Sequence, residues 1–237
     1  DFCIAHAKPI AMVGIALLVI ACVGMSRIVV NNNMVHWFKS GSEIRMADRV
    51  MKERLGGTST GYLVVQGAGE DAIKDPAMLR GIERLQRELE KDPLVGKTFS
   101  AADYVKRINR VLHDDDPARE TIPDSASEIG QYLFLFSTSA KPSDLDNVVD
   151  YPFQRANIFL QLKSWDAGVM RQVIARTAAW QAQNPLPGNP QIKPAGIAYF
   201  NLVWSDEVLW GMLESFLAGL VLVLIILIIQ TRSLLWG

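Results

Sequence analysis

Residues 216–229 read FLAGLVLVLIILII, an unbroken apolar run without a charged side chain. Counted back to Trp210, the apolar stretch has 20 residues. A helix of that length measures about 30 Å, which matches the hydrocarbon thickness of a bilayer. Trp204 and Trp210 precede the run and Trp236 follows it, as aromatic residues at the two membrane interfaces do. The stretch therefore predicts a membrane-spanning helix.

Glu214 is the one charged residue within this predicted span. An ionisable residue inside a membrane is by default a candidate functional residue, because burying its charge in lipid is costly. The alternative is that Glu214 lies at the outer headgroup level, one turn after Trp210, where its charge costs little. We favour the headgroup level.

A second apolar segment lies near the start of the chain, at residues 9–25 (PIAMVGIALLVIACVGM). Its 17 residues would form about 25 Å of helix, and Ile28, Val29 and Val30 prolong it. The alternative is a buried helix of a soluble protein. A signal peptide fits poorly, because Ser26-Arg27-Ile28 is no small-x-small cleavage site. Two spans would place both ends on one side of the membrane, and Lys8 and Arg232 on the outer flanks indicate the cytoplasm.

The charge of the chain is nearly balanced, with 24 Lys and Arg against 25 Asp and Glu. A nucleic-acid-binding protein normally shows a basic excess, so no nucleic acid is expected as a partner of this chain. Cys3 and Cys22 lie at or inside the first apolar segment, and the region between the two segments has no cysteine. The outer domain is therefore expected to depend on its core and not on disulfides. Because the sequence opens with Asp1 and stops at Gly237, we expect it to be a piece of a longer protein.

Between the two apolar segments, helical and strand patterns alternate. The helices are expected at 42–55, from Asp75-Pro76, from Ser100 and from Asp166. The strands are expected at 62–66, 95–99, 155–163 and 192–198. This order predicts an α+β domain of the split βαβ, or ferredoxin-like, type, an open sheet with helices on one face.

Two of these elements carry specific expectations about burial. In the first helix, Ser40 and Glu43 suggest a capping box. Its expected buried stripe consists of Ile44, Ala47, Met51 and Leu55. In the strand at 155–163, strict alternation predicts a buried row of Ala156, Ile158, Leu160 and Leu162.

The sequence offers little for catalysis. His6, His36 and His113 are scattered, and HExxH and Gly-x-Ser-x-Gly motifs are absent. The Gly- and Thr-rich residues 56–61 lack the Lys of a phosphate-binding loop and are better interpreted as a helix stop and turn. The acidic triplet after His113 is too closely spaced for a metal site and has no second group of ligands. We expect that the protein is not an enzyme and that it binds no cofactor and no metal. No substrate-binding residue is identified.

Short strings spread over the chain resemble a transporter family. They are NNNMVHWF at 31–38, SEIRMAD at 42–48, LGGT at 55–58, KDP at 74–76, VGK at 95–97, AD at 102–103, IPD at 122–124 and TRSLLWG at 231–237. Their order and spacing resemble the resistance-nodulation-division (RND) superfamily, in its hydrophobe/amphiphile efflux branch of predicted lipid exporters with sterol-sensing-like membrane domains. The resemblance covers essentially the whole chain.

The resemblance implies a proton-driven exporter of two repeats, each a span, an extracytoplasmic porter domain and five more spans. This chain would supply a cytoplasmic tail (1–8), a first span and its exit (9–30), a porter-like domain (31–201), a continuous helix with the second span (202–230) and the start of a cytoplasmic turn (231–237). We favour the second repeat, because residues precede the first span. The family's proton-carrying acids lie on later spans, so none is assigned here.

The implied location is the bacterial inner (plasma) membrane, as a multi-pass protein. The implied partners are membrane lipids, a hydrophobic or amphiphilic cargo, the remaining transmembrane helices and the second porter domain. One alternative is the extracytoplasmic sensor domain of a two-span receptor, although such receptors continue into a charged helical linker, whereas residues 232–237 (RSLLWG) suit a tight turn. A further alternative is an accessory subunit that only scaffolds partners.

Overall fold

A computed structural model of the 237-residue chain describes residues 6–25, 33–139 and 142–232. The chain divides into two compact units, residues 1–31 and residues 32–237. The first unit contains helix α2 (Ala7–Met25). Within the described ranges, one helix is long and apolar enough to cross a membrane, the stretch Ile197–Gln230 of helix α9.

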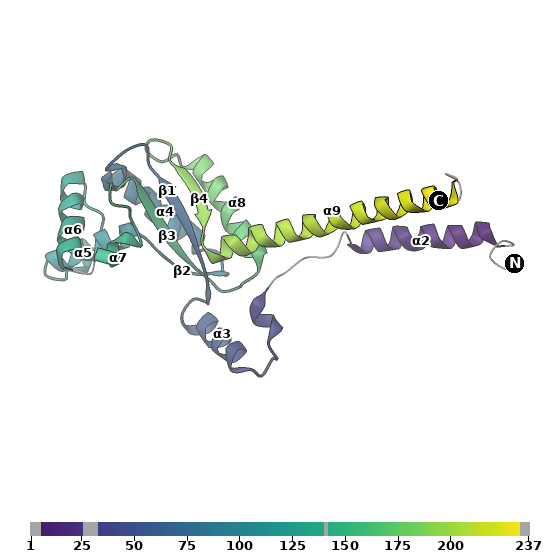
Figure 1. The fold of residues 1–237 in the computed structure, drawn as a ribbon. Coiled ribbons are helices and arrows are strands. Elements are labelled where there is room, and N and C mark those ends of the chain that lie inside the picture. Colours follow the sequence, from purple (N-terminus) through teal and green to yellow (C-terminus); the bar gives the residue numbers. More distant parts are fainter. Residues whose placement is uncertain (1–5, 26–32, 140–141, 233–237) are drawn as a thin grey trace. The chain divides into compact units, whose positions relative to one another are not determined.

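The second unit is a mixed α+β domain that continues into α9 (Figure 1). Its strands are β1 (Ser59–Gln66), β2 (Val95–Phe99), β3 (Arg155–Leu162) and β4 (Gln191–Ala195). Its helices are α3 (Glu43–Arg54), α4 (Pro76–Leu89), α5 (Ala101–Leu112), α6 (Ala126–Ser139), α7 (Pro142–Asp146), α8 (Ala167–Gln183) and α9 (Ile197–Thr231). Short 3-10 turns are η1 (Met34–Trp37), η2 (Ala72–Lys74) and η3 (Pro117–Arg119).

The four strands form one sheet in the order β2-β3-β1-β4, and every neighbouring pair is antiparallel. The two ends of the sheet differ in which strands begin and finish there. We call the end where β1 and β2 begin and β3 and β4 finish the α9 end, since α9 follows β4 there. The other is the far end.

The predicted alternation in β3 is confirmed. Its buried row is fully enclosed and consists of Ala156, Ile158, Leu160 and Leu162. On β1 the same alternation buries Leu63 and Val65, whereas Tyr62, Val64 and Gln66 are half-buried. Helices α4 and α8 pack against each other and cover the buried face. A sheet with one covered face explains why the sequence alternates so strictly in these two central strands.

Three helix starts were predicted from their capping residues, and all three are confirmed. The carboxylates of Asp75 and Asp166 each accept a hydrogen bond at 2.8 Å from the backbone N–H two residues later. At the expected start of α5, Ser100 and Asp103 form a capping box. The predicted glycine stop after α3 is also present, since Gly56 and Gly57 both have positive φ.

The prediction for α3 itself was wrong in two respects. Its N-cap is Ser42, whose Oγ accepts a hydrogen bond from the Arg45 N–H, and not Ser40. Its expected buried stripe is not buried either: Ile44 and Leu55 are exposed, and the single buried residue of α3 is Asp48. An amphipathic pattern predicts that a helix has an apolar face, but it cannot tell what covers that face.

Two boundaries near the end of the domain also differ from the prediction. The last strand stops at Ala195, three residues early, because Gly196 turns the chain with φ +87°. A Cβ at this position would lie 2.5 Å from the Tyr62 ring, so glycine allows the close approach. Helix α9 therefore starts at Ile197 and not near Leu202.

The first part of α9 belongs to the folded domain. Ala198, Leu202 and Ser205 are buried against β1, β4 and α8. Arg171 of α8 forms an ion pair with Asp206, with nitrogen–oxygen distances of 2.8 and 3.1 Å. Beyond this contact, the large apolar side chains between Leu209 and Ile229, apart from Ile228, are 41–70% exposed. One continuous helix thus joins a packed segment to a lipid-compatible one.

Candidate functional site

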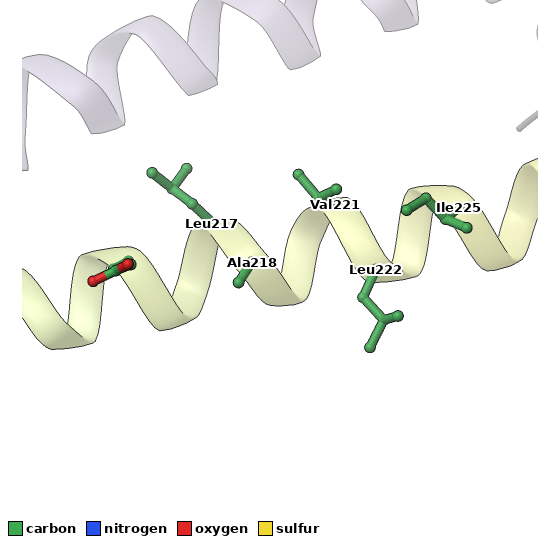
Figure 2. Close-up of a pocket in the computed structure, with 6 residues that line it drawn as sticks. Leu217, Ala218, Val221, Leu222 and Ile225 are labelled. Atoms are coloured by element: carbon green, nitrogen blue, oxygen red, sulfur yellow. The ribbon is translucent and has the colours of Figure 1, made fainter.

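Glu214 lies in the exposed part of α9, next to an apolar stretch of the helix surface. This stretch consists of Leu217, Ala218, Val221, Leu222 and Ile225 (Figure 2). Figure 2 shows Leu217, Val221 and Ile225 on one side of the helix and Ala218 and Leu222 on another. Such a surface suits lipid tails or another apolar helix.

The position of Glu214 along α9 bears on its role. It is four residues after Trp210, which amounts to about 6 Å of helix. If Trp210 marks the outer interface, the Glu214 carboxylate is within reach of the headgroups and need not be buried in lipid. The headgroup assignment stays a prediction.

A cavity that the sequence did not predict lies at the far end of the sheet. Its volume is ≈ 510 Å³. Helix α6 contributes Gly130, Phe134 and Ser137, which fall on one helical face. The rest of the lining comes from α7, the turn η2 and the loop at 149–153 that leads into β3. Phe134 and Tyr151 are exposed at this cavity.

Backbone hydrogen bonds hold the loop and η2 together at this cavity. The N–H of Asp71 donates to the Pro152 carbonyl, and the N–H of Ile73 donates to the Phe153 carbonyl, each at 3.0 Å. The Lys74 ammonium lies 4.2 Å from the centre of the Phe153 ring and 2.7 Å from the Asp71 carboxylate. These contacts give the cavity one fixed wall, whereas α6 and α7 supply the other.

The chemistry of the cavity is mixed. Leu145, Val149 and the aromatic rings make apolar surface. Four carboxylates line it, those of Glu70, Asp71, Asp146 and Asp150, against the single ammonium of Lys74. Asp150 is already engaged, since its Oδ1 accepts from the N–H groups of Gln154 and Arg155 at 2.8 Å. Apolar surface with a polar, acidic side suits an amphiphile whose head is neutral or cationic.

The acidic triplet after His113 has local structural roles. Asp115 forms an ion pair with Arg110 at 2.9 Å, and Asp116 caps η3 by accepting from the Ala118 N–H at 2.9 Å. Asp114 and Asp115 both have positive φ, so the triplet is where the chain turns after α5. In the part of the chain that the structure describes, no three His, Cys, Asp or Glu side chains gather as metal ligands would.

A smaller polar hollow of ≈ 370 Å³ lies beside this turn. Two of its lining residues are hydrogen-bonded to the Tyr132 hydroxyl, the Glu128 carboxylate at 2.6 Å and Asn109 Oδ1 at 3.1 Å. Burial, together with the nearby Glu128 carboxylate, raises the pKa of Tyr132 to about 12. The hydroxyl is thus held protonated and serves to join α6 to α5.

The large cavity escaped the sequence analysis because its walls are far apart in the chain. Residues 70–74, 130–137 and 145–153 come together only in the folded domain. The one local signal was the apolar run at 132–136, in which Phe134 and Leu135 are exposed directly after the buried Tyr132 and Leu133. Comparison with known proteins adds no family assignment: no protein-family model matches this chain, and no curated protein matches it.

Proposed function

We propose that this chain is part of a proton-driven RND-type transporter that exports hydrophobic or amphiphilic, lipid-like molecules, and that it supplies the extracytoplasmic domain that guides the cargo. The observation that carries the proposal is α9. It begins inside the domain, packs on β1 and α8, and continues without a break into the apolar stretch. A helix shared between domain and membrane lets a movement of the span reach the cargo-guiding domain.

The fold is consistent with a porter-type domain. In a split βαβ unit, two parallel strands joined by a helix leave room for a third strand between them. Here β1 and β2 are joined through α4, and β3 lies between them, antiparallel to both. Helix α8 leads in the same way from β3 to the outer strand β4. This strand order supports the proposal of a porter-type domain.

The cavity supports a cargo-guiding role. It lies at the far end of the sheet, whereas α9 starts at the other end. With α9 in the membrane, an amphiphile held there would have left the bilayer. The apolar walls would hold its tail and the acidic side its polar head.

Within this proposal, α2 is a first span and α9 contains the second, both ends of the chain are cytoplasmic, and the protein is a multi-pass protein of the bacterial inner membrane. Its partners are membrane lipids, the cargo, the remaining transmembrane helices and a second porter domain. The proton pathway lies on those remaining helices and does not use Glu214.

The proposal is tested with the complete protein reconstituted in vesicles, by following a fluorescent lipid-like dye under a pH gradient. One variant replaces Glu207 and Val208, where α9 leaves the domain, with two glycines. Each glycine weakens a helix by about 1 kcal/mol relative to alanine. The matched control replaces the same two residues with alanine.

We expect gradient-dependent dye movement in the parent and in the alanine variant, and its loss in the glycine variant with dye binding retained. If the complete protein moves no dye under a gradient, the transporter proposal is wrong. If a ligand instead changes the activity of a cytoplasmic domain without transport, the receptor alternative is correct.

A further inference from the structure

The segment from η1 to α3, residues 34–55, exposes an unusual number of large apolar side chains for an element outside the two apolar helices. They are 36–72% exposed and comprise Met34, Trp37, Phe38, Ile44, Met46, Val50 and Leu55. We call residues 34–55 the η1–α3 segment. It lies beyond the α9 end of the sheet (Figure 1).

Helical geometry separates the side chains of α3 into two sides. At 100° per residue, Met46, Ala47, Val50 and Met51 share one side, with charged residues on it only in the first and last turns. Arg45, Arg49 and Lys52 share another. Met46 and Val50 lie nearly opposite Asp48 on the helical wheel, and Asp48 is the residue that α3 buries against the domain. The exposed apolar side therefore points away from the folded domain.

A chain of hydrogen bonds holds α3 at this end of the sheet. The Asp48 carboxylate accepts from the Thr58 hydroxyl at 2.5 Å, and the Thr58 oxygen accepts from the Trp165 indole N–H at 2.9 Å. The Trp165 carbonyl in turn accepts from the Asn201 amide at 2.7 Å. Asn201 belongs to the packed part of α9. The apolar side of α3 is thus fixed relative to the helix that carries the membrane-spanning stretch.

The charge of the segment also sets it apart. Residues 34–55 carry five Lys or Arg against three Asp or Glu, whereas the whole chain has a net charge of −1. One of the three acids, Asp48, is paired with Lys52 at 2.7 Å. Basic and apolar side chains together, with a Trp and a Phe at the edge, are typical of helices that lie in a membrane interface. The basic side chains suit anionic lipid phosphates.

We propose that the η1–α3 segment lies in the outer interface of the membrane that α9 spans, with Met46 and Val50 among the acyl chains and Trp37 at the headgroups. The occupant of this apolar side is therefore a lipid surface that contains anionic phosphates. The domain then has a second attachment besides α9, which sets its tilt on the membrane. This inference requires α9 to span the membrane, but it does not require the chain to be a transporter.

The test compares two valines that are equally exposed in the structure. Val50 in α3 is 54% exposed and Val111 in α5 is 55% exposed. A nitroxide is attached to a single cysteine at either position in the full chain, with Cys3 and Cys22 replaced by serine and alanine, in vesicles of phosphatidylcholine and phosphatidylglycerol. A label at Leu224 in α9 provides the lipid reference. The measured quantity is the ratio of collision rates with oxygen, which partitions into lipid, and with a water-soluble nickel complex.

We expect the ratio at Val50 to be severalfold higher than at Val111 and to approach the ratio at Leu224. Equal ratios at the two valines would mean that Val50 faces water, and would overturn the proposal. Low collision rates with both reagents would also overturn it, because a protein surface and not lipid would then cover α3. A low ratio at Leu224 as well would show that α9 is no span, and the inference would fail with it.

Changing the lipid composition tests whether the basic side chains of the η1–α3 segment bind anionic lipid phosphates. Vesicles of phosphatidylcholine alone are expected to lower the ratio at Val50 and to leave Leu224 unchanged, and Arg49→Gln in mixed vesicles should do the same. A ratio at Val50 that is unaffected by both changes would contradict the anionic phosphates as ligands. None of these measurements depends on transport, so their failure is distinguishable from failure of the proposed function.

Discussion

The substitution Leu160→Ala tests the core of the sheet domain most directly. Leu160 is fully buried in the central strand β3, paired with Gly61 on β1 and Thr98 on β2. Removing a buried leucine side chain costs about 2–5 kcal/mol, the upper end applying where neighbours cannot close the cavity. Strands on both sides of Leu160 limit such closure. A loss of this size is a large part of the roughly 5–15 kcal/mol that stabilises a typical protein.

The assay is thermal unfolding of the purified chain, followed by tryptophan fluorescence and near-ultraviolet circular dichroism. For a domain of this size, each kcal/mol lowers the midpoint by about 2–4 °C, so we expect a decrease of roughly 4–20 °C. Leu160→Met is the matched control, because it keeps the volume and should cost less than about 1.5 kcal/mol. An unchanged midpoint for Leu160→Ala would refute the assigned burial of this face of β3.

Four further outcomes follow. Single cysteines at Asp115 and Ser233 should react with an impermeant reagent from opposite sides of the membrane; reaction from the same side would exclude the two-span topology. Gly57→Ala should destabilise the domain by about 1–3 kcal/mol in a denaturant titration, because φ is +114° and a Cβ would collide with the Leu162 carbonyl, whereas Gly69→Ala, in open space, should cost far less. Burial raises the pKa of Tyr132 from about 10 in the unfolded chain to about 12, so its stabilisation is complete below pH 10 and is lost as the pH rises towards 12; Tyr132→Phe should flatten stability over that interval, and an identical alkaline profile would contradict the assignment. This chain alone should move no lipid-like dye under a pH gradient; if it does, and Glu214→Gln abolishes the movement, the proton pathway includes Glu214.

The parts of the fold that depend on neighbours in sequence were predictable. Asp75, Ser100 and Asp166 cap their helices because their side chains reach backbone N–H groups two or three residues away. The alternation around Leu160 is equally local, since each residue of a strand points to the opposite face from the next. These features need no knowledge of what lies across the core.

The features that escaped prediction depend on contacts between distant segments. The apolar pattern of α3 was assigned to the core, but Asp48 is what meets the domain, through Thr58 and Trp165. The cavity requires η2, α6 and the loop before β3 to meet, and no local pattern contains that information. The early start of α9 depends on the contact between Gly196 and the Tyr62 ring.

A single residue, Gly196, separates β4 from α9, and the first turns of α9 are packed on the sheet domain. With no linker to absorb rotation, the sheet domain cannot rotate independently of α9. If α9 spans a membrane, the fluorescence anisotropy of a rigid dye attached at Tyr151, at the far end of the sheet, should therefore decay slowly. The decay rate should be that of a helix rotating in viscous lipid, and not that of a small domain rotating in water. The membrane viscosity would then set the orientational dynamics of the cavity at the far end of the sheet.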